Sequence, residues 1–98
     1  MIVVDYPIII YPADLDEWDF KDMETYGAAG AAVQVSEGKI VEVTFLDIPR
    51  FTELTEASEN LGVPCYYREN LIIVTKITKE KIAETVKYLF ESRYFDHR

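Results

Sequence analysis

The feature that most constrains the fold is a pair of alternating apolar stretches joined by Glu37 and Gly38. Apolar residues occupy every second position in residues 31–36 and again in residues 39–46. A period of two is typical of strands that bury one face. A glycine in a two-residue connection between such strands favours a hairpin. The pattern therefore predicts an antiparallel β-hairpin with one apolar face against a core.

Two helices are expected, one directly after the hairpin and one near the C-terminus of the chain. Asp47 is placed to cap a helix with Pro49 in its first turn, and Gly62 is placed to end it. A second helix is expected from the cap Thr78 to about Tyr94. Its apolar residues fall at i, i+4, i+7 and i+8 and form one stripe: Ile82, Val86, Leu89 and Phe90. Each helix should therefore bury one face.

The remaining apolar stretches predict further strands. Residues 2–11 favour a strand, which Pro7 restricts to a sheet edge. Residues 63–67 and 71–77 suggest a second hairpin. For residues 12–26 we expect one or two helical turns and then a loop. The prediction is an α+β fold with residues 1–98 as a single domain. It is a single, mostly antiparallel sheet of about five strands with two helices packed on one face, in the order β-ββα-ββα.

The second face of this sheet is also partly apolar, and large apolar patches are rarely left in contact with water. The sequence leaves two possibilities for what buries this second face. Trp18, Phe20 and the rest of residues 12–26 could fold over it, or a partner or second copy of the chain could cover it. The sequence does not choose between them.

The charge of the chain restricts its partners. The formal net charge is −8, and residues 1–70 hold 14 acids against 4 bases, a net of −10. Nucleic acids and anionic membranes need a basic footprint on the protein. We therefore expect no nucleic-acid partner and no membrane partner. With no long apolar run and no secretory leader pattern, we expect the protein in the cytoplasm.

Few residues offer catalytic or metal chemistry. The single histidine, His97, lies next to the chain end, and the single cysteine, Cys65, is expected to be a small buried residue in a strand. Without a second histidine, the usual nucleophile–base pairs cannot be assembled. The acids from Asp14 onward lack the glycine and glutamate spacing of a calcium loop. We therefore expect no enzyme activity, no cofactor and no metal.

The most unusual segment is acidic and aromatic, and it runs from Asp14 to Glu24. Exposed aromatic rings supply binding energy, and opposite charge steers encounter with a partner. We expect this segment to dock on a basic protein, as in inhibitors, immunity proteins and antitoxins. Its candidate residues are Asp14, Asp16, Glu17, Trp18, Asp19, Asp22 and Glu24. The alternatives are a self-associating structural or complex-subunit domain, with a possible homodimer, and a domain that senses a small ligand near Gly27 to Gly30.

Overall fold

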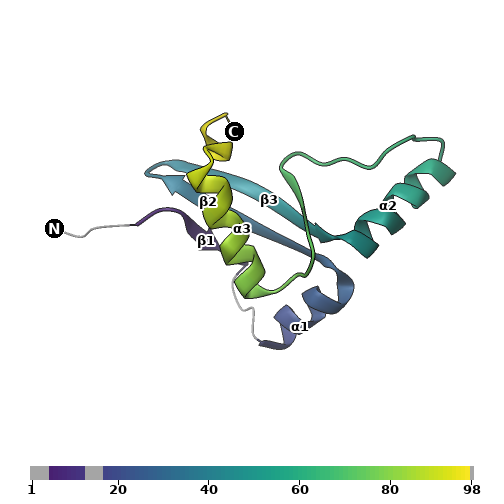
Figure 1. The fold of residues 1–98 in the computed structure, drawn as a ribbon, viewed down its shortest axis with the longest axis horizontal. Coiled ribbons are helices and arrows are strands. Elements are labelled where there is room, and N and C mark those ends of the chain that lie inside the picture. The colour runs from purple at the N-terminus through teal and green to yellow at the C-terminus, as the bar shows by residue number, and fades with distance from the viewer. Residues whose placement is uncertain (1–4, 13–16, 98) are drawn as a thin grey trace.

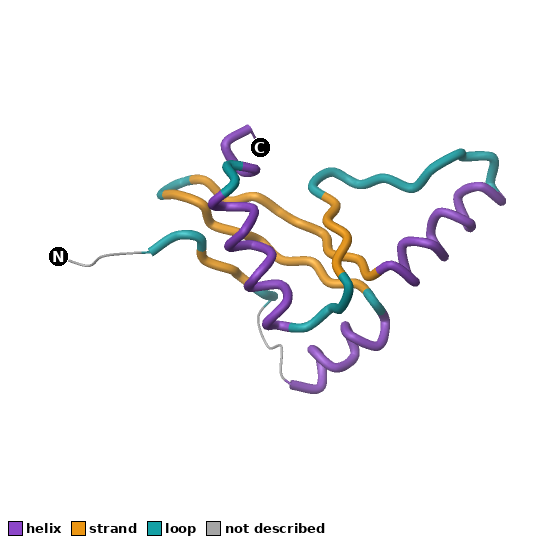
Figure 2. The backbone as a smooth tube through the Cα atoms, in the orientation of Figure 1, coloured by secondary structure: helices purple, strands orange, loops and turns teal. Residues whose placement is uncertain are grey.

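The computed structural model describes residues 5–12 and 17–97 (Figures 1 and 2). It is an α+β structure with one mixed four-strand sheet, mostly antiparallel, and three α-helices. The elements in chain order are β1 (Ile8–Ile10), α1 (Glu17–Tyr26), β2 (Ala28–Ser36), β3 (Lys39–Asp47), α2 (Ile48–Asn60), β4 (Leu71–Val74), α3 (Lys79–Glu91) and a final 3₁₀ turn, η1 (Tyr94–His97). The strand order in the sheet is β1-β2-β3-β4.

The predicted hairpin is confirmed, and it forms the centre of the sheet. Strands β2 and β3 are nine residues each and pair antiparallel, with Val33 opposite Val41 and Ala31 opposite Val43. The turn residue Gly38 has φ +77, a left-handed conformation that glycine adopts without steric cost. Strands β1 and β4 pair with this long hairpin, and α3 packs on it.

One face of the hairpin carries the core. Alternate residues of β2 and β3 point to the same side, where α3 packs on them (Figure 1). The predicted stripe of α3 supplies Ile82 and Val86, both fully buried, and the half-buried Leu89 and Phe90. Val74, Ile77 and Phe95 complete this side of the core. The amphipathic pattern of α3 thus predicted its packing correctly.

The helix boundaries follow the predicted caps. The Asp47 side chain accepts a hydrogen bond from Arg50 N at 2.9 Å, and Thr78 Oγ1 accepts one from Lys81 N at 3.1 Å. At the end of α2, Gly62 has φ +84, and its N–H donates to Glu59 O at 2.9 Å. Both helices therefore begin at the predicted residues, and α2 ends where glycine was expected to stop it.

The prediction of a second hairpin is wrong. Residues 63–67 form no strand, and β4 pairs with β3 in the parallel direction, with Phe45 beside Ile72. A parallel neighbour requires the chain to cross over and return from the far end of α2. Residues 61–70 are used for that return, so the sheet has four strands and not about five.

Asn70 fixes the point at which β4 begins. It adopts a left-handed conformation with φ 53, and its backbone O accepts a hydrogen bond from Thr44 N at 3.1 Å. Its side-chain Nδ2 donates to Glu42 O at 3.1 Å, while its Oδ1 accepts from the Tyr94 hydroxyl at 3.2 Å. One residue therefore ties the return segment to both β3 and the C-terminal turn.

The expectation that two helices pack on one face of the sheet is also wrong. Of the two predicted helices, α3 covers the core face, whereas α2 extends away from the sheet (Figure 1) and has no buried residue. The last residue of β3, Asp47, is also the N-cap of α2, so no loop allows the helix to turn back. Of the segment 12–26, residues 13–16 lie outside the described residues, and the rest contains more helix than expected, because α1 is ten residues long. Within residues 5–11 the predicted strand is observed at Ile8–Ile10, on the sheet edge as Pro7 required, whereas residues 2–4 lie outside the described residues.

The side of the sheet opposite α3 is here called the open face. Strand register places twelve residues on it, of which Glu42 is the charged one: Ile8, Ile10, Ala28, Gly30, Ala32, Gln34, Ile40, Glu42, Thr44, Leu46, Leu71 and Ile73. Ile10, Ile40 and Ile73 are exposed. Leu46 is buried but lies outside the core cluster, as expected from its side of the sheet.

Candidate partner-binding surface

The predicted docking segment is organised by helix α1, which flanks the sheet. Phe20 and Met23 face inward: Phe20 meets the Tyr11 ring edge to face at 5.0 Å, and Met23 packs against the core. Lys79 Nζ lies 4.9 Å from the centre of the Phe20 ring. These contacts hold the inner side of α1 and leave its other side to solvent.

Three residues form the outer edge of α1, here called the α1 ridge: Trp18, Asp22 and Tyr26. Their i, i+4, i+8 spacing aligns them along one side of the helix. Trp18 is 72% exposed and Tyr26 is 61% exposed, and Asp22 between them is exposed as well. Two large rings beside a carboxylate are thus presented to solvent.

Each ring of the ridge is in contact with a cation from the same chain. Lys21 Nζ lies 5.0 Å from the centre of the Trp18 ring, and the Arg50 guanidinium lies 3.8 Å from the centre of the Tyr26 ring. Exposed contacts of this type contribute about 0.5–1 kcal/mol. The rings are therefore positioned by neighbouring cations, and they are not buried.

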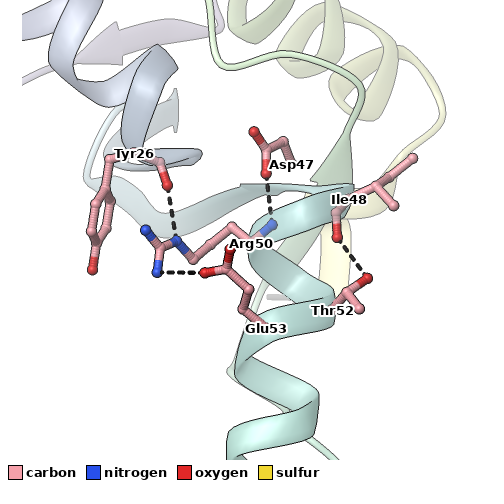
Figure 3. Close-up of polar contacts among 6 residues, drawn as sticks. All are labelled: Tyr26, Asp47, Ile48, Arg50, Thr52 and Glu53. Atoms are coloured by element: carbon pink, nitrogen blue, oxygen red, sulfur yellow. Dashed lines mark hydrogen bonds and ion pairs between the residues drawn. The ribbon is translucent and has the colours of Figure 1, made fainter.

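The C-terminal end of the ridge is anchored at the start of α2. Figure 3 shows Arg50 Nε donating to Tyr26 O at 2.9 Å while its guanidinium pairs with Glu53 at 3.2 Å. The backbone N–H of the same arginine donates to Asp47 Oδ1. Arg50 thus connects α1 to the first turn of α2.

Gly27 makes this junction sterically possible. It ends α1 with φ +83, and its N–H donates to Met23 O at 2.8 Å, while its carbonyl accepts from Asp47 N at 2.9 Å. A Cβ at this position would lie 2.6 Å from Asp47 Oδ1. The close approach of the capping carboxylate therefore requires glycine here.

The structure places the predicted site residues as follows. Asp14 and Asp16 lie outside the described residues, and Glu17 is the first residue of α1. Trp18, Asp22 and Glu24 are exposed on α1, whereas Asp19 is half-buried.

Two neighbouring residues were missed by the sequence prediction. Tyr26 had a usable signal, since it continues the helical spacing of Trp18 and Asp22. Arg50 had none, because it lies 24 residues beyond the tyrosine that it contacts.

The described residues offer little reactive chemistry. No group of three or more His, Cys, Asp or Glu side chains suited to a metal ion occurs within residues 5–12 and 17–97. Cys65 is exposed in the return segment, so its predicted burial in a strand is wrong. Burial raises the pKa of the Tyr11 phenol, and the nearby Glu80 carboxylate raises it further. A phenol that stays protonated near neutral pH is not a base.

A hollow next to α1 bears on the small-ligand alternative. It has a volume of about 530 Å³, and Ile10, Met23, Gly30 and Ala32 are among its lining residues. Glu42 and Thr44 also line it, but most of its lining residues are apolar or small. Gly27 packs on Asp47 and does not line it. The hollow is apolar and belongs largely to the open face of the sheet.

Among the described residues, no helix has the length and apolar character needed to cross a membrane.

Comparison with known proteins adds no relative from which a function could be transferred. No protein family, curated protein or solved structure matches the chain.

Proposed function

We propose that this chain is a small, acidic, non-enzymatic binding protein that docks the α1 ridge on a basic protein. The observation that carries this proposal is the 72% exposure of Trp18 on an ordered helix. Tryptophan is one of the residues enriched at the energetic centres of interfaces, and its exposed ring offers a large rigid area for such a contact. An inhibitor-like or immunity-like protein of the cytoplasm is the corresponding class.

Charge around the ridge supports a basic partner. Asp22 and Glu24 are exposed on α1. Glu53 lies near the C-terminal end of the ridge, where it pairs with Arg50. A net charge of −8 steers the encounter with a cationic surface and loses this effect as salt rises.

The test uses the whole chain as an immobilised bait in cell extract at low and at high salt. A basic protein should be captured at low salt and released at high salt. Capture should fall at least ~tenfold, or about 1.4 kcal/mol, with Trp18→Ala or with Asp22→Asn combined with Glu24→Gln. The matched control is Glu56→Gln with Glu59→Gln, which removes the same charge from α2.

Trp18 also gives a direct signal, because it is the single tryptophan of the chain. Its fluorescence emission should shift to the blue when the purified basic partner covers the ring. The proposal would be refuted if the captured proteins were the same for the ridge variants and the control, or if Trp18 emission did not change on binding.

A further inference from the structure

Two apolar surfaces are only partly covered by the residues that the structure describes. The first is an arm, defined here as residues 48–70, which comprises α2 and the return segment. No residue of α2 is buried, and Leu61 at its end is 84% exposed. The second is the open face of the sheet, where Ile40 is 58% exposed. Helices and sheets normally bury such surfaces against one another.

The arm cannot cover the open face of its own sheet. Strand β3 passes directly into α2 at Asp47, and the Asp47 carboxylate caps the helix. Arg50 then fixes the first turn against Tyr26, as Figure 3 shows. A helix of 13 residues is about 20 Å long, and it points away from the sheet (Figures 1 and 2). Its direction is therefore set at its base.

The accessible surface of all 98 residues, taken together, is larger than expected for a compact chain of this mass. It is 7111 Å², whereas a folded monomer of 11.3 kDa should expose about 5,700 Å². The radius of gyration is 14.8 Å, compared with about 13 Å expected for a compact domain of this length. The excess is about 1,400 Å², and a stable interface of standard size buries ~800 Å² on each partner.

We propose that a second copy of the chain supplies the cover, with the arm of each copy on the open face of the other. A two-fold arrangement uses both surfaces of both chains at once, since each chain has one spare helix and one uncovered face. A different partner would have to match both surfaces separately. The excess area of one chain is larger than the ~800 Å² that each partner buries in an interface of standard size.

The charges on the two surfaces are compatible with this contact. Glu42 is the charged residue of the open face. On α2, Phe51, Leu54 and Ser58 lie on the half-buried side and continue toward Leu61, while the exposed acids Glu53, Glu56 and Glu59 lie on the other side. The contact therefore brings together mainly uncharged side chains, and most of the net negative charge stays in solvent.

The hollow next to α1 fits the same arrangement. It opens on the open face over Gly30 and Ala32, where small residues leave room. Apolar side chains of the partner arm would fill it, which explains an apolar hollow with few polar groups. The alternative occupant, a small ligand, would leave the mass of the particle at that of one chain.

The experiment is light scattering after size exclusion on the full chain over a wide range of concentration. The expected mass is twice the 11.3 kDa of one chain. Leu61→Asp on the arm and Ile40→Lys on the open face should each give monomers with an unchanged circular dichroism spectrum. Tyr88→Lys is the matched control, because Tyr88 is 69% exposed on α3, away from both surfaces.

Mixing the two variants tests the arm-to-face geometry. A Leu61→Asp chain and an Ile40→Lys chain together form one native contact and one contact with opposite charges, so the dimer should return. A monomeric wild-type chain would overturn the proposal. A dimer that survives Leu61→Asp, or a mixture that stays monomeric, would overturn it as well, since a face-to-face dimer would not involve Leu61.

Discussion

Replacing Gly27 with alanine should destabilise the protein by about 2 kcal/mol. Two effects add at this position. The backbone has φ +83, and holding a residue with a Cβ in a left-handed conformation costs about 1–2 kcal/mol. The new Cβ would lie 2.6 Å from Asp47 Oδ1, so the capping carboxylate must move, and a lost N-cap costs about 1 kcal/mol. The lower entropy of the unfolded alanine chain offsets about 0.4–1 kcal/mol.

Two other glycines separate the two effects. Gly62 also has a positive φ, of +84, but a Cβ there would meet nothing within 4 Å. Gly62→Ala should therefore cost about 1 kcal/mol, from the backbone alone. Gly30 has neither a positive φ nor a neighbour within 4 Å in its own chain, so in the monomeric Leu61→Asp background Gly30→Ala should be neutral or stabilise by up to ~0.5 kcal/mol.

The assay is urea unfolding followed by circular dichroism at one fixed chain concentration, because dimerisation would make the midpoint concentration-dependent. With a slope of ~1–3 kcal/mol/M, the Gly27→Ala midpoint should fall by roughly 1 M. The reasoning is refuted if Gly27→Ala equals Gly62→Ala, since the contact with Asp47 would then contribute nothing. It is equally refuted if Gly30→Ala is the most destabilising of the three.

Three further outcomes are expected. Because the pKa of Tyr11 is raised in the folded state, the contribution of its protonated phenol to stability is complete below pH ~10 and is lost as the pH rises above that value. In urea melts between about pH 9 and 11, the Tyr11→Phe variant should therefore lose less stability than the wild-type chain. Asn70→Ala should lower the free energy of unfolding by about 2 kcal/mol, and Asn70→Gly should lower it by about 1 kcal/mol. Both variants lose the side-chain hydrogen bonds, but glycine tolerates φ 53. Ile82→Ala should cost about 3 kcal/mol and Leu89→Ala about half as much, because Leu89 is only half-buried; equal costs would contradict the assigned core.

The sequence predicted those parts of the fold that depend on local signals. The β2–β3 hairpin was set by alternation and by Gly38, and the starts of α2 and α3 were set by Asp47 and Thr78. The parallel pairing of β4 was not predictable in this way. It depends on Asn70 contacts with Glu42 and Tyr94, which are 28 and 24 residues distant along the chain.

The candidate site was predictable to a similar degree. Composition selected the acidic, aromatic segment, and helical spacing could have added Tyr26 to Trp18 and Asp22. It could not supply Arg50, which reaches the ridge from another helix. Nor could it separate the half-buried Asp19 from the exposed Asp22, because the inner side of α1 is defined by contacts with Tyr11 and the core.

Helix α2 shows most clearly why an apolar stripe on a helix does not predict the surface against which the helix packs. The stripe that begins at Phe51 and Leu54 has the same period as that of α3, and the sequence assigned both helices to one face of the sheet. The difference lies in the connections. Thr78 follows a turn after β4 that lets α3 lie back on the sheet, whereas Asp47 ends β3 and caps α2 at the same residue. The stripe of α2 is held away from its own sheet and is only half-buried, so the mass of the particle in solution tests the proposal that a second copy covers it.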